Sequence, residues 1–295
     1  MTVIILSLIV AFNSILTYQR NKVWANEFTL WDDTVKKSPW KSRPLMNRGS
    51  FYNNHGKLNA ALLDYTKAIT LDPGSVNGYI RRAAIYLEQG KYAQTVSDLN
   101  KAIEISPGNA IYYFNRGYTY SKLKSNSQAI RDFTKAIALF PKYAEAYFRR
   151  GLDFIDQGNK FQAMSDFNQT IEIDPHNVKA YNNRGNIYSQ QGDFLKALSD
   201  YNKAIELDPD DAQAYINRGN TYSQQGHLPQ ALLDYNTAIA IKPNYVEAYS
   251  NRAVVHYLLK EYDKAWSDVD QAQALRGRIN PDFVNALKNA SGKDK

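Results

Sequence analysis

Apolar and small side chains recur along this chain at an interval of 34 residues, between residues 42 and 279. When each interval starts three residues after a proline, positions 4, 8 and 11 are mostly aromatic, small and aromatic. Spacings of four and three place these positions on one face of a helix. Positions 20, 24 and 27 follow the same rule and predict a second helix. The seven intervals, called repeats 1 to 7, are residues 42–75, 76–109, 110–143, 144–177, 178–211, 212–245 and 246–279.

Turn-forming residues mark where each predicted helix ends. Position 15 is glycine in five repeats, a helix-stop signal, and is Lys124 or Lys260 in the other two. Position 32 is proline in repeats 1 to 6, and proline cannot donate the helical hydrogen bond. Small residues at positions 8, 20 and 27 let the two helices approach closely. A fixed period of this kind predicts one helical hairpin that is copied and stacked, with stability as a sum of local terms.

The pattern resembles the tetratricopeptide repeat (TPR), and the resemblance covers Ser42 to Ile279 in seven tandem copies. It implies an all-α solenoid, a right-handed superhelix of helix-turn-helix repeats with a concave groove. Its usual role is to bind an extended peptide or a partner protein, so we expect a protein-interaction scaffold. No nucleophile, base and orienting group converge in the pattern, and we therefore do not expect an enzyme.

The first residues have a different character. Residues 2–19 carry no charge, and as a helix they would span about 27 Å, enough for a bilayer core. The pattern favours a transmembrane helix over residues 1–22; a signal peptide and a buried cap helix are the alternatives. Arg20, Lys22, Lys36 and Lys37 follow, and by the positive-inside rule they favour cytoplasmic repeats.

Residues 23–41 read as a partial leading repeat, with Trp24, Glu27, Trp31 and Pro39 at the spacing of a second helix. This junction resembles the one at which membrane glycosyltransferase-type proteins pass into C-terminal TPRs. That resemblance implies repeats on the non-cytoplasmic side, and a chain that recruits substrate for catalysis located elsewhere. An assembly factor for an envelope complex is a third reading. At the other end, residues 280–295 predict a cap helix over 281–289 and a tail.

Charged residues also keep the 34-residue interval. Position 7 is arginine and position 23 is aspartate in every repeat. In antiparallel helices joined near position 15, these two positions lie opposite each other. We therefore expect one arginine–aspartate pair per repeat, from Arg48 with Asp64 to Arg252 with Asp268, because a guanidinium can bond a carboxylate in two places. A pair of this kind favours a structural role over ligand binding, since binding surfaces usually vary between repeats.

The resemblance places the groove on the first helix, at positions 2, 5, 6, 9, 12 and 13. Position 6 is asparagine in five repeats, similar to the asparagine ladder of the repeats attached to protein O-GlcNAc transferases. An amide both donates and accepts hydrogen bonds, so it can bond a peptide backbone whatever the side chains. Position 5 has no lysine, which argues against the clamp for acidic chaperone tails. The expected groove residues are Asn47, Arg81, Asn115, Arg149, Asn183, Asn186, Gln190, Asn217, Asn220, Gln224 and Asn251. A solvated polar face is the alternative.

Composition narrows the remaining classes. The net charge is +7, but the basic residues are spread along the repeats among acids, so we expect no nucleic acid partner. Most of the 22 tyrosines sit at repeat positions that face helix packing. There is no cysteine, and the four histidines share no repeat position, so we expect neither disulfides nor a metal or other cofactor. The expected partners are a protein or extended peptide and a membrane through residues 2–19. The membrane side of the repeats and the oligomeric state are left open.

Overall fold

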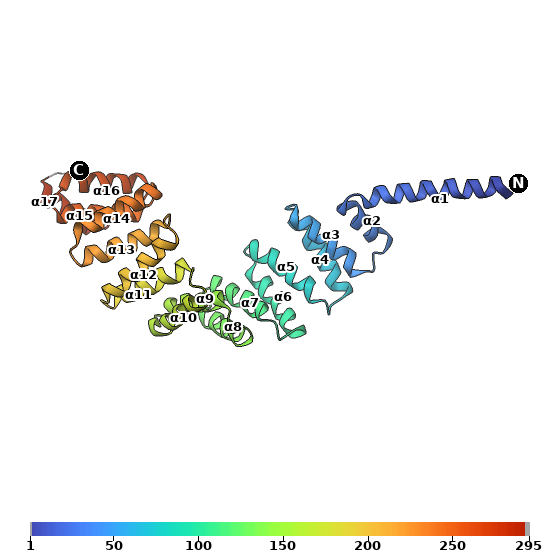
Figure 1. The fold of residues 1–295 in the computed structure, drawn as a ribbon, viewed down its shortest axis with the longest axis horizontal. Helices are drawn as coiled ribbons and strands as arrows, with labels where there is room; N and C mark the ends of the chain where they lie inside the picture. Colours follow the sequence, from blue (N-terminus) through green and yellow to red (C-terminus); the bar gives the residue numbers. More distant parts are fainter. Residues whose placement is uncertain (1, 293–295) are drawn as a thin grey trace. The chain divides into compact units, whose positions relative to one another are not determined.

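A computed structural model describes residues 2–292, with side chains from Asn13 to Gly292. This range forms helices and turns and contains no strand. The chain divides into two compact units, residues 1–141 and 142–295, which we call the N-terminal and C-terminal units. Figure 1 shows the helices in chain order.

The N-terminal unit holds two leading helices and repeats 1 to 3. Its helices are α1 (Thr2–Trp24), α2 (Glu27–Lys37), α3 (Ser42–Asn54), α4 (Leu58–Leu71), α5 (Val76–Glu88), α6 (Tyr92–Ile105), α7 (Ala110–Lys122) and α8 (Asn126–Leu139). The C-terminal unit holds repeats 4 to 7 and a last helix. Its helices are α9 (Ala144–Asp156), α10 (Lys160–Ile173), α11 (Val178–Gln190), α12 (Phe194–Leu207), α13 (Ala212–Gln224), α14 (Leu228–Ile241), α15 (Val246–Leu258), α16 (Tyr262–Ala274) and α17 (Pro281–Ser291). The all-α architecture and the helix pair in each repeat are confirmed.

The turn inside each repeat has one backbone geometry. Gly56, for example, has φ of +70°, in the left-handed region that glycine enters without steric cost. Lys124 and Lys260, the two exceptions to the glycine pattern, adopt the same conformation with φ of 58° and 61°. The turn is therefore kept where its preferred residue is missing, because packing of the flanking helices holds the backbone there.

The core of each repeat is a ring or aliphatic group enclosed by small residues. Ala61 and Ala68 of α4, at positions 20 and 27, are almost fully buried, as is Tyr65 between them at position 24. The Tyr65 ring lies against Gly49, where an added Cβ would be only 2.7 Å from Cε1 of the ring. The same contact recurs in four further repeats, at Gly117, Gly151, Gly185 and Gly219. A glycine at position 8 therefore lets an aromatic ring pass between the helices.

The two ends of the repeat array are covered by additional helices. In the N-terminal unit, Val35 of α2 shares a buried cluster with Leu45 and Ala68 of repeat 1. In the C-terminal unit, Leu287 of α17 is fully buried and shares a cluster with Val269 of repeat 7. Helix α17 begins at Pro281 and is capped by Asn280, whose side chain accepts a hydrogen bond from the Asp282 N–H.

Among the residues whose side chains are described, we find no helix with the length and apolar character needed to cross a membrane. Residues 2–12, half of the predicted transmembrane segment of residues 1–22, have side chains outside that description. The part of α1 whose side chains are described begins at Asn13 and includes Arg20 and Lys22.

Candidate functional site

The predicted arginine–aspartate pairs form in all seven repeats. In each pair, Nε and Nη2 of the arginine donate to the two carboxylate oxygens over distances of 2.6–2.9 Å. The aspartates are buried and the arginines are largely covered. This two-point geometry is the strong form of an ion pair. It joins the two helices of each hairpin at a fixed height.

The arginines also bond the repeat before their own. The third nitrogen, Nη1, donates to the preceding second helix: to Asp32 from Arg48, to Thr66 from Arg82 and to Asn100 from Arg116. In the C-terminal unit, the same bond runs to Asn168, Asn202 and Asn236. These acceptors occupy position 25, and we did not anticipate them from the sequence, although a hydrogen-bonding residue at every position 25 was a visible signal. The guanidinium groups thus link neighbouring repeats.

In six of the seven repeats, a tyrosine at position 4 completes the surroundings of the arginine. In repeats 2 to 7, the guanidinium carbon lies 5.5–6.0 Å from the centre of that ring, within the range of a cation–π contact. The hydrogen bond to aspartate raises the pKa of the arginine, as at Arg184 beside Asp200. Burial raises the pKa of Asp166. The N–H groups of the arginines at position 7 bond residues inside the fold. These arginines therefore have a structural role.

The structure places the expected groove residues at three depths. Arg81, Gln190 and Gln224 are exposed. Asn217 is buried, its Oδ1 accepts from Gln213, and its Nδ2 lacks a partner. The remaining seven are half-buried: Asn47, Asn115, Arg149, Asn183, Asn186, Asn220 and Asn251. Only some of the expected groove residues are therefore fully open to solvent.

The two groove arginines lie in different surroundings. Arg81 of α5 is exposed, whereas Nε of Arg149 on α9 donates to Glu145 one turn earlier, at 2.6 Å. Asn183 is also engaged locally, because its Nδ2 donates to the Lys179 carbonyl. A ligand would have to displace these contacts to use Arg149 or Asn183 fully.

A cavity of about 320 Å³ opens between α13 and α15 in the C-terminal unit, and we call it the polar pocket. The Tyr235 hydroxyl donates to Asn220 Oδ1 at 2.7 Å, and Asn251 Nδ2 donates to the same oxygen at 2.8 Å. Gln224 and Glu247 also line the pocket, and burial raises the pKa of Glu247. The pocket offers amide groups whose orientation is fixed by the tyrosine.

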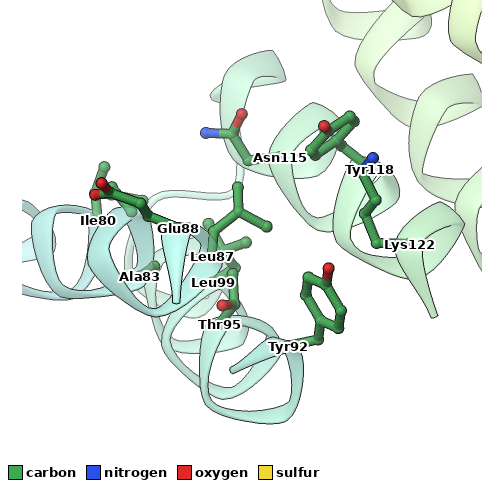
Figure 2. Close-up of a pocket in the computed structure, with 11 residues that line it drawn as sticks. Ile80, Ala83, Leu87, Glu88, Tyr92, Thr95, Leu99, Asn115, Tyr118 and Lys122 are labelled. Atoms are coloured by element: carbon green, nitrogen blue, oxygen red, sulfur yellow. The ribbon is translucent and has the colours of Figure 1, made fainter. Parts of the chain in front are cut away.

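A cavity of about 450 Å³ opens at the equivalent place between α5 and α7 in the N-terminal unit, and we call it the apolar pocket. Leu87 and Leu99 form its floor, and Tyr92 and Tyr118 stand at its side (Figure 2). Asn115 is the one predicted groove residue among its lining residues. We did not anticipate this pocket from the sequence.

Among the described residues, no group of three or more histidine, cysteine, aspartate or glutamate side chains could hold a metal ion. The side chains that line the two pockets can form hydrogen bonds, ion pairs and apolar contacts. These interactions support the reversible binding of a ligand.

Models of the tetratricopeptide repeat match most of the repeat region. They are described as "TPR repeat" and "Tetratricopeptide repeat" and match residues 42–75, 64–96, 83–124, 110–143, 145–177, 167–199, 185–226 and 219–260. Every repeat is covered at least in part, which agrees with the helix pairs seen in the structure. A comparison with curated protein sequences found no match.

Several solved structures share the fold. MamA is 26% identical, with a TM-score of 0.53 over 56% of this chain and 96% of its own. YrrB, described as a TPR protein with an unusual peptide-binding site, is 23% identical, with a TM-score of 0.53 over 62% of this chain and 95% of its own. A tetratricopeptide repeat protein from Parabacteroides merdae is 20% identical, with a TM-score of 0.64 over 85% of this chain and 99% of its own.

Proposed function

The chain belongs to the tetratricopeptide repeat proteins, and we propose that it is an interaction scaffold that binds an extended peptide along its first helices. The proposal rests mainly on one observation, the orientation of amide side chains by buried tyrosines. Tyr201 donates to Asn186 Oδ1 and Tyr235 donates to Asn220 Oδ1, both at 2.7 Å. Each bond occupies the amide oxygen and fixes the plane of the amide group.

A fixed amide suits the recognition of a peptide backbone. The hydrogen bonds of an extended chain point sideways at regular intervals and are independent of its sequence. An amide side chain that is already oriented loses little conformational entropy when it bonds such a chain. YrrB, which has a peptide-binding site, shares the fold. These points favour a peptide over a rigid folded partner.

The peptide proposal can be tested with random twelve-residue peptides displayed on phage and selected on the full chain. Selected peptides are then synthesised, and their dissociation constants are measured for the wild type and for Asn220→Ala/Asn251→Ala. Loss of two hydrogen bonds should weaken binding by about tenfold. The matched control is Gln169→Ala/Gln271→Ala, which removes two exposed amides from the second helices. Equal affinities of both double variants would argue against the groove, and a selection that yields no peptide would argue against the function.

We also propose that residues 2–19 tether the scaffold to a membrane. Their lack of charge over a length of about 27 Å supports this part of the proposal. Extraction of isolated membranes with carbonate tests it. A tethered chain stays with the lipid, whereas a peripheral chain appears in the soluble fraction and would contradict the tether. A chain that lacks residues 2–19 serves as the control.

A further inference from the structure

The residues at positions 8 and 24 vary together within this chain. In repeats 1, 3, 4, 5 and 6, a glycine at position 8 faces an aromatic ring at position 24. An added Cβ on these glycines would lie 2.7–3.0 Å from the ring, so even one methyl group would clash with the ring. Repeats 2 and 7 carry Ala83 with Leu99 and Ala253 with Val269. Where the ring is missing, a methyl group takes only part of its space.

The two repeats without a ring fill the remaining space differently. In repeat 7, Leu287 of α17 is fully buried in one cluster with Ala253 and Val269. An apolar side chain from outside the seven repeats therefore covers this layer. Repeat 2 is followed by α7 of repeat 3, which presents Tyr118 and the small Thr119. The apolar pocket of about 450 Å³ remains open between α5 and α7. Repeat 2 thus shares the alanine and aliphatic pair of repeat 7, and an open cavity lies beside its nearly fully buried Leu99.

We propose that the apolar pocket is the anchor site of the bound peptide and takes a large aromatic side chain that has an acidic residue beside it. This inference rests on the proposed function. Half-buried Ile80 and Leu87 present carbon to the pocket, and the nearly fully buried Leu99 lies beneath them, as the face of an aromatic ring requires (Figure 2). A cavity of this size lies within the range of about 300–1,000 Å³ that is typical of ligand pockets.

The rim of the pocket provides the polar half of the recognition. Lys122 of α7 is exposed, and its Nζ lies 5.2 Å from the centre of the Tyr118 ring. Arg81, one residue beyond Ile80 on α5, is exposed as well. Glu88 lies on the α5 side of the rim, away from Lys122 (Figure 2). The charge therefore favours an acidic residue on the Lys122 side of the anchor.

The position of the pocket favours a peptide over a free small molecule. Half-buried Asn115, at position 6 of repeat 3, lies at the pocket's edge, on the same helix face as the oriented amides of the C-terminal unit. A chain that bonds Asn115 through its backbone places alternate side chains toward the helices. One of these side chains can enter the pocket while the backbone continues along the groove.

The phage-selected peptides described above also test the anchor. The pocket is filled by Ala83→Gly/Leu99→Phe, which reproduces the glycine and ring of repeats 3 and 4. We expect selected peptides to share an aromatic residue next to an acidic one, and to bind this variant at least tenfold more weakly. Lys122→Glu, a surface change that leaves the core untouched, should weaken binding by about threefold to tenfold. Replacing the peptide's aromatic residue with alanine should remove the effect of the filled pocket, and replacing its acidic residue with the matching amide should remove the effect of Lys122→Glu.

Two controls separate the anchor from general damage. Leu99→Met keeps the volume of the floor and should bind like the wild type. Tyr235→Phe alters the polar pocket and should leave the preference for an aromatic residue intact. The anchor is overturned if filling the pocket leaves affinity unchanged, if selected peptides lack a large apolar residue, or if free indole binds there but no peptide does. If Asn220→Ala/Asn251→Ala weakens binding while the filled variant does not, the anchor fails and the groove function stands.

Discussion

The apolar pocket of repeats 2 and 3 and the polar pocket of repeats 6 and 7 lie at equivalent places in the repeat, yet their chemistry is opposite. In the polar pocket, Tyr235 at position 24 extends its hydroxyl group to Asn220. In the apolar pocket, Leu99 at the same position has no polar group, and the lining around it is mostly apolar. The arginine–aspartate pairs are the same in both. Besides position 24, the linings differ at positions 9 and 12, which are Ala84 and Leu87 in the apolar pocket and Asn220 and Ser223 in the polar pocket. A few positions of the repeat thus set the chemistry of the groove on one common scaffold.

The largest expected effect concerns what the two sites share. Asp132→Ala removes the partner of Arg116, which fixes α7 at one wall of the apolar pocket. A buried arginine left without its carboxylate should cost about 3–5 kcal/mol of unfolding free energy. Asp268→Ala on α16 removes the partner of Arg252 on α15, beside the polar pocket, and should cost a similar amount. Urea denaturation of both variants measures this.

A double-mutant cycle sharpens the same test. Arg116→Ala/Asp132→Ala should cost clearly less than the sum of the two single changes, because no charge is left unpaired. Additive costs would show that the pair does not stabilise the hairpin. Very different costs for Asp132→Ala and Asp268→Ala would show that the two sites do not share one scaffold.

The next largest effect concerns positions 8 and 24, at which the two pockets differ. Leu99→Phe should cost about 1–3 kcal/mol, because the new ring meets the Ala83 methyl group. The added change Ala83→Gly should recover much of that loss, less about 0.5–1 kcal/mol for a glycine inside a helix. In repeat 6, Gly219→Ala should destabilise, since the added Cβ would lie 2.8 Å from Tyr235 Cε1. Thermal unfolding followed by circular dichroism gives these values, and no rescue by Ala83→Gly would contradict the pairing of positions 8 and 24.

A smaller effect should follow from the tyrosine hydroxyl groups. Tyr235→Phe removes the bond to Asn220 and should cost about 0.5–1.5 kcal/mol. Tyr201→Phe removes the equivalent bond to Asn186 and should cost about the same. Tyr65→Phe should cost less, because the Tyr65 hydroxyl lies 3.3 Å from Ser50 Oγ. Equal losses for all three variants in urea denaturation would mean that the amides are not held by these bonds.

The smallest effect concerns pH and belongs to the polar pocket alone. Burial raises the pKa of Glu247 above its ordinary value of 4.5, so the folded chain binds this proton more tightly than the unfolded chain. The contribution of Glu247 to the unfolding free energy is therefore more favourable at low pH and is lost as the pH rises through the folded pKa. Glu247→Gln should be slightly more stable than the wild type at pH 7 and should lose that advantage near pH 3. Urea denaturation of both proteins at several pH values measures this, and a constant difference between them would contradict the raised pKa.

The repeat architecture could be predicted from the sequence because it depends on local chemistry copied seven times. Glycine, proline and the face spacing set the helix limits, and positions 7 and 23 face each other in any hairpin with this turn. The bond from arginine to position 25 of the preceding repeat was missed, although every residue at that position can accept a hydrogen bond. Its discovery requires the stacking of one repeat on the next.

The groove was harder to predict because exposure depends on side chains that lie far apart in the sequence. Asn217 has the same position number as Asn183 and Asn251, yet it alone is buried, beside Gln213, which also accepts a hydrogen bond from Tyr245 at the end of the same repeat. The apolar pocket was missed for a related reason. Leucine and tyrosine both satisfy an apolar pattern at position 24, and only the reach of the side chain distinguishes a filled layer from an open one. The joint change of Ala83 and Leu99 was the visible signal.

The hydrogen bonds from arginines to acceptors in the preceding second helix also have a consequence for synthesis. A chain made from its N-terminus completes the acceptor at position 25 before the arginine of the next repeat appears, as with Asn202 before Arg218. Each new hairpin therefore meets a finished surface to bond. Folding that starts early and extends in the direction of translation leaves few guanidinium groups waiting for partners. A stalled ribosome would thus hold a chain that is already ordered, repeat by repeat, up to the point of synthesis.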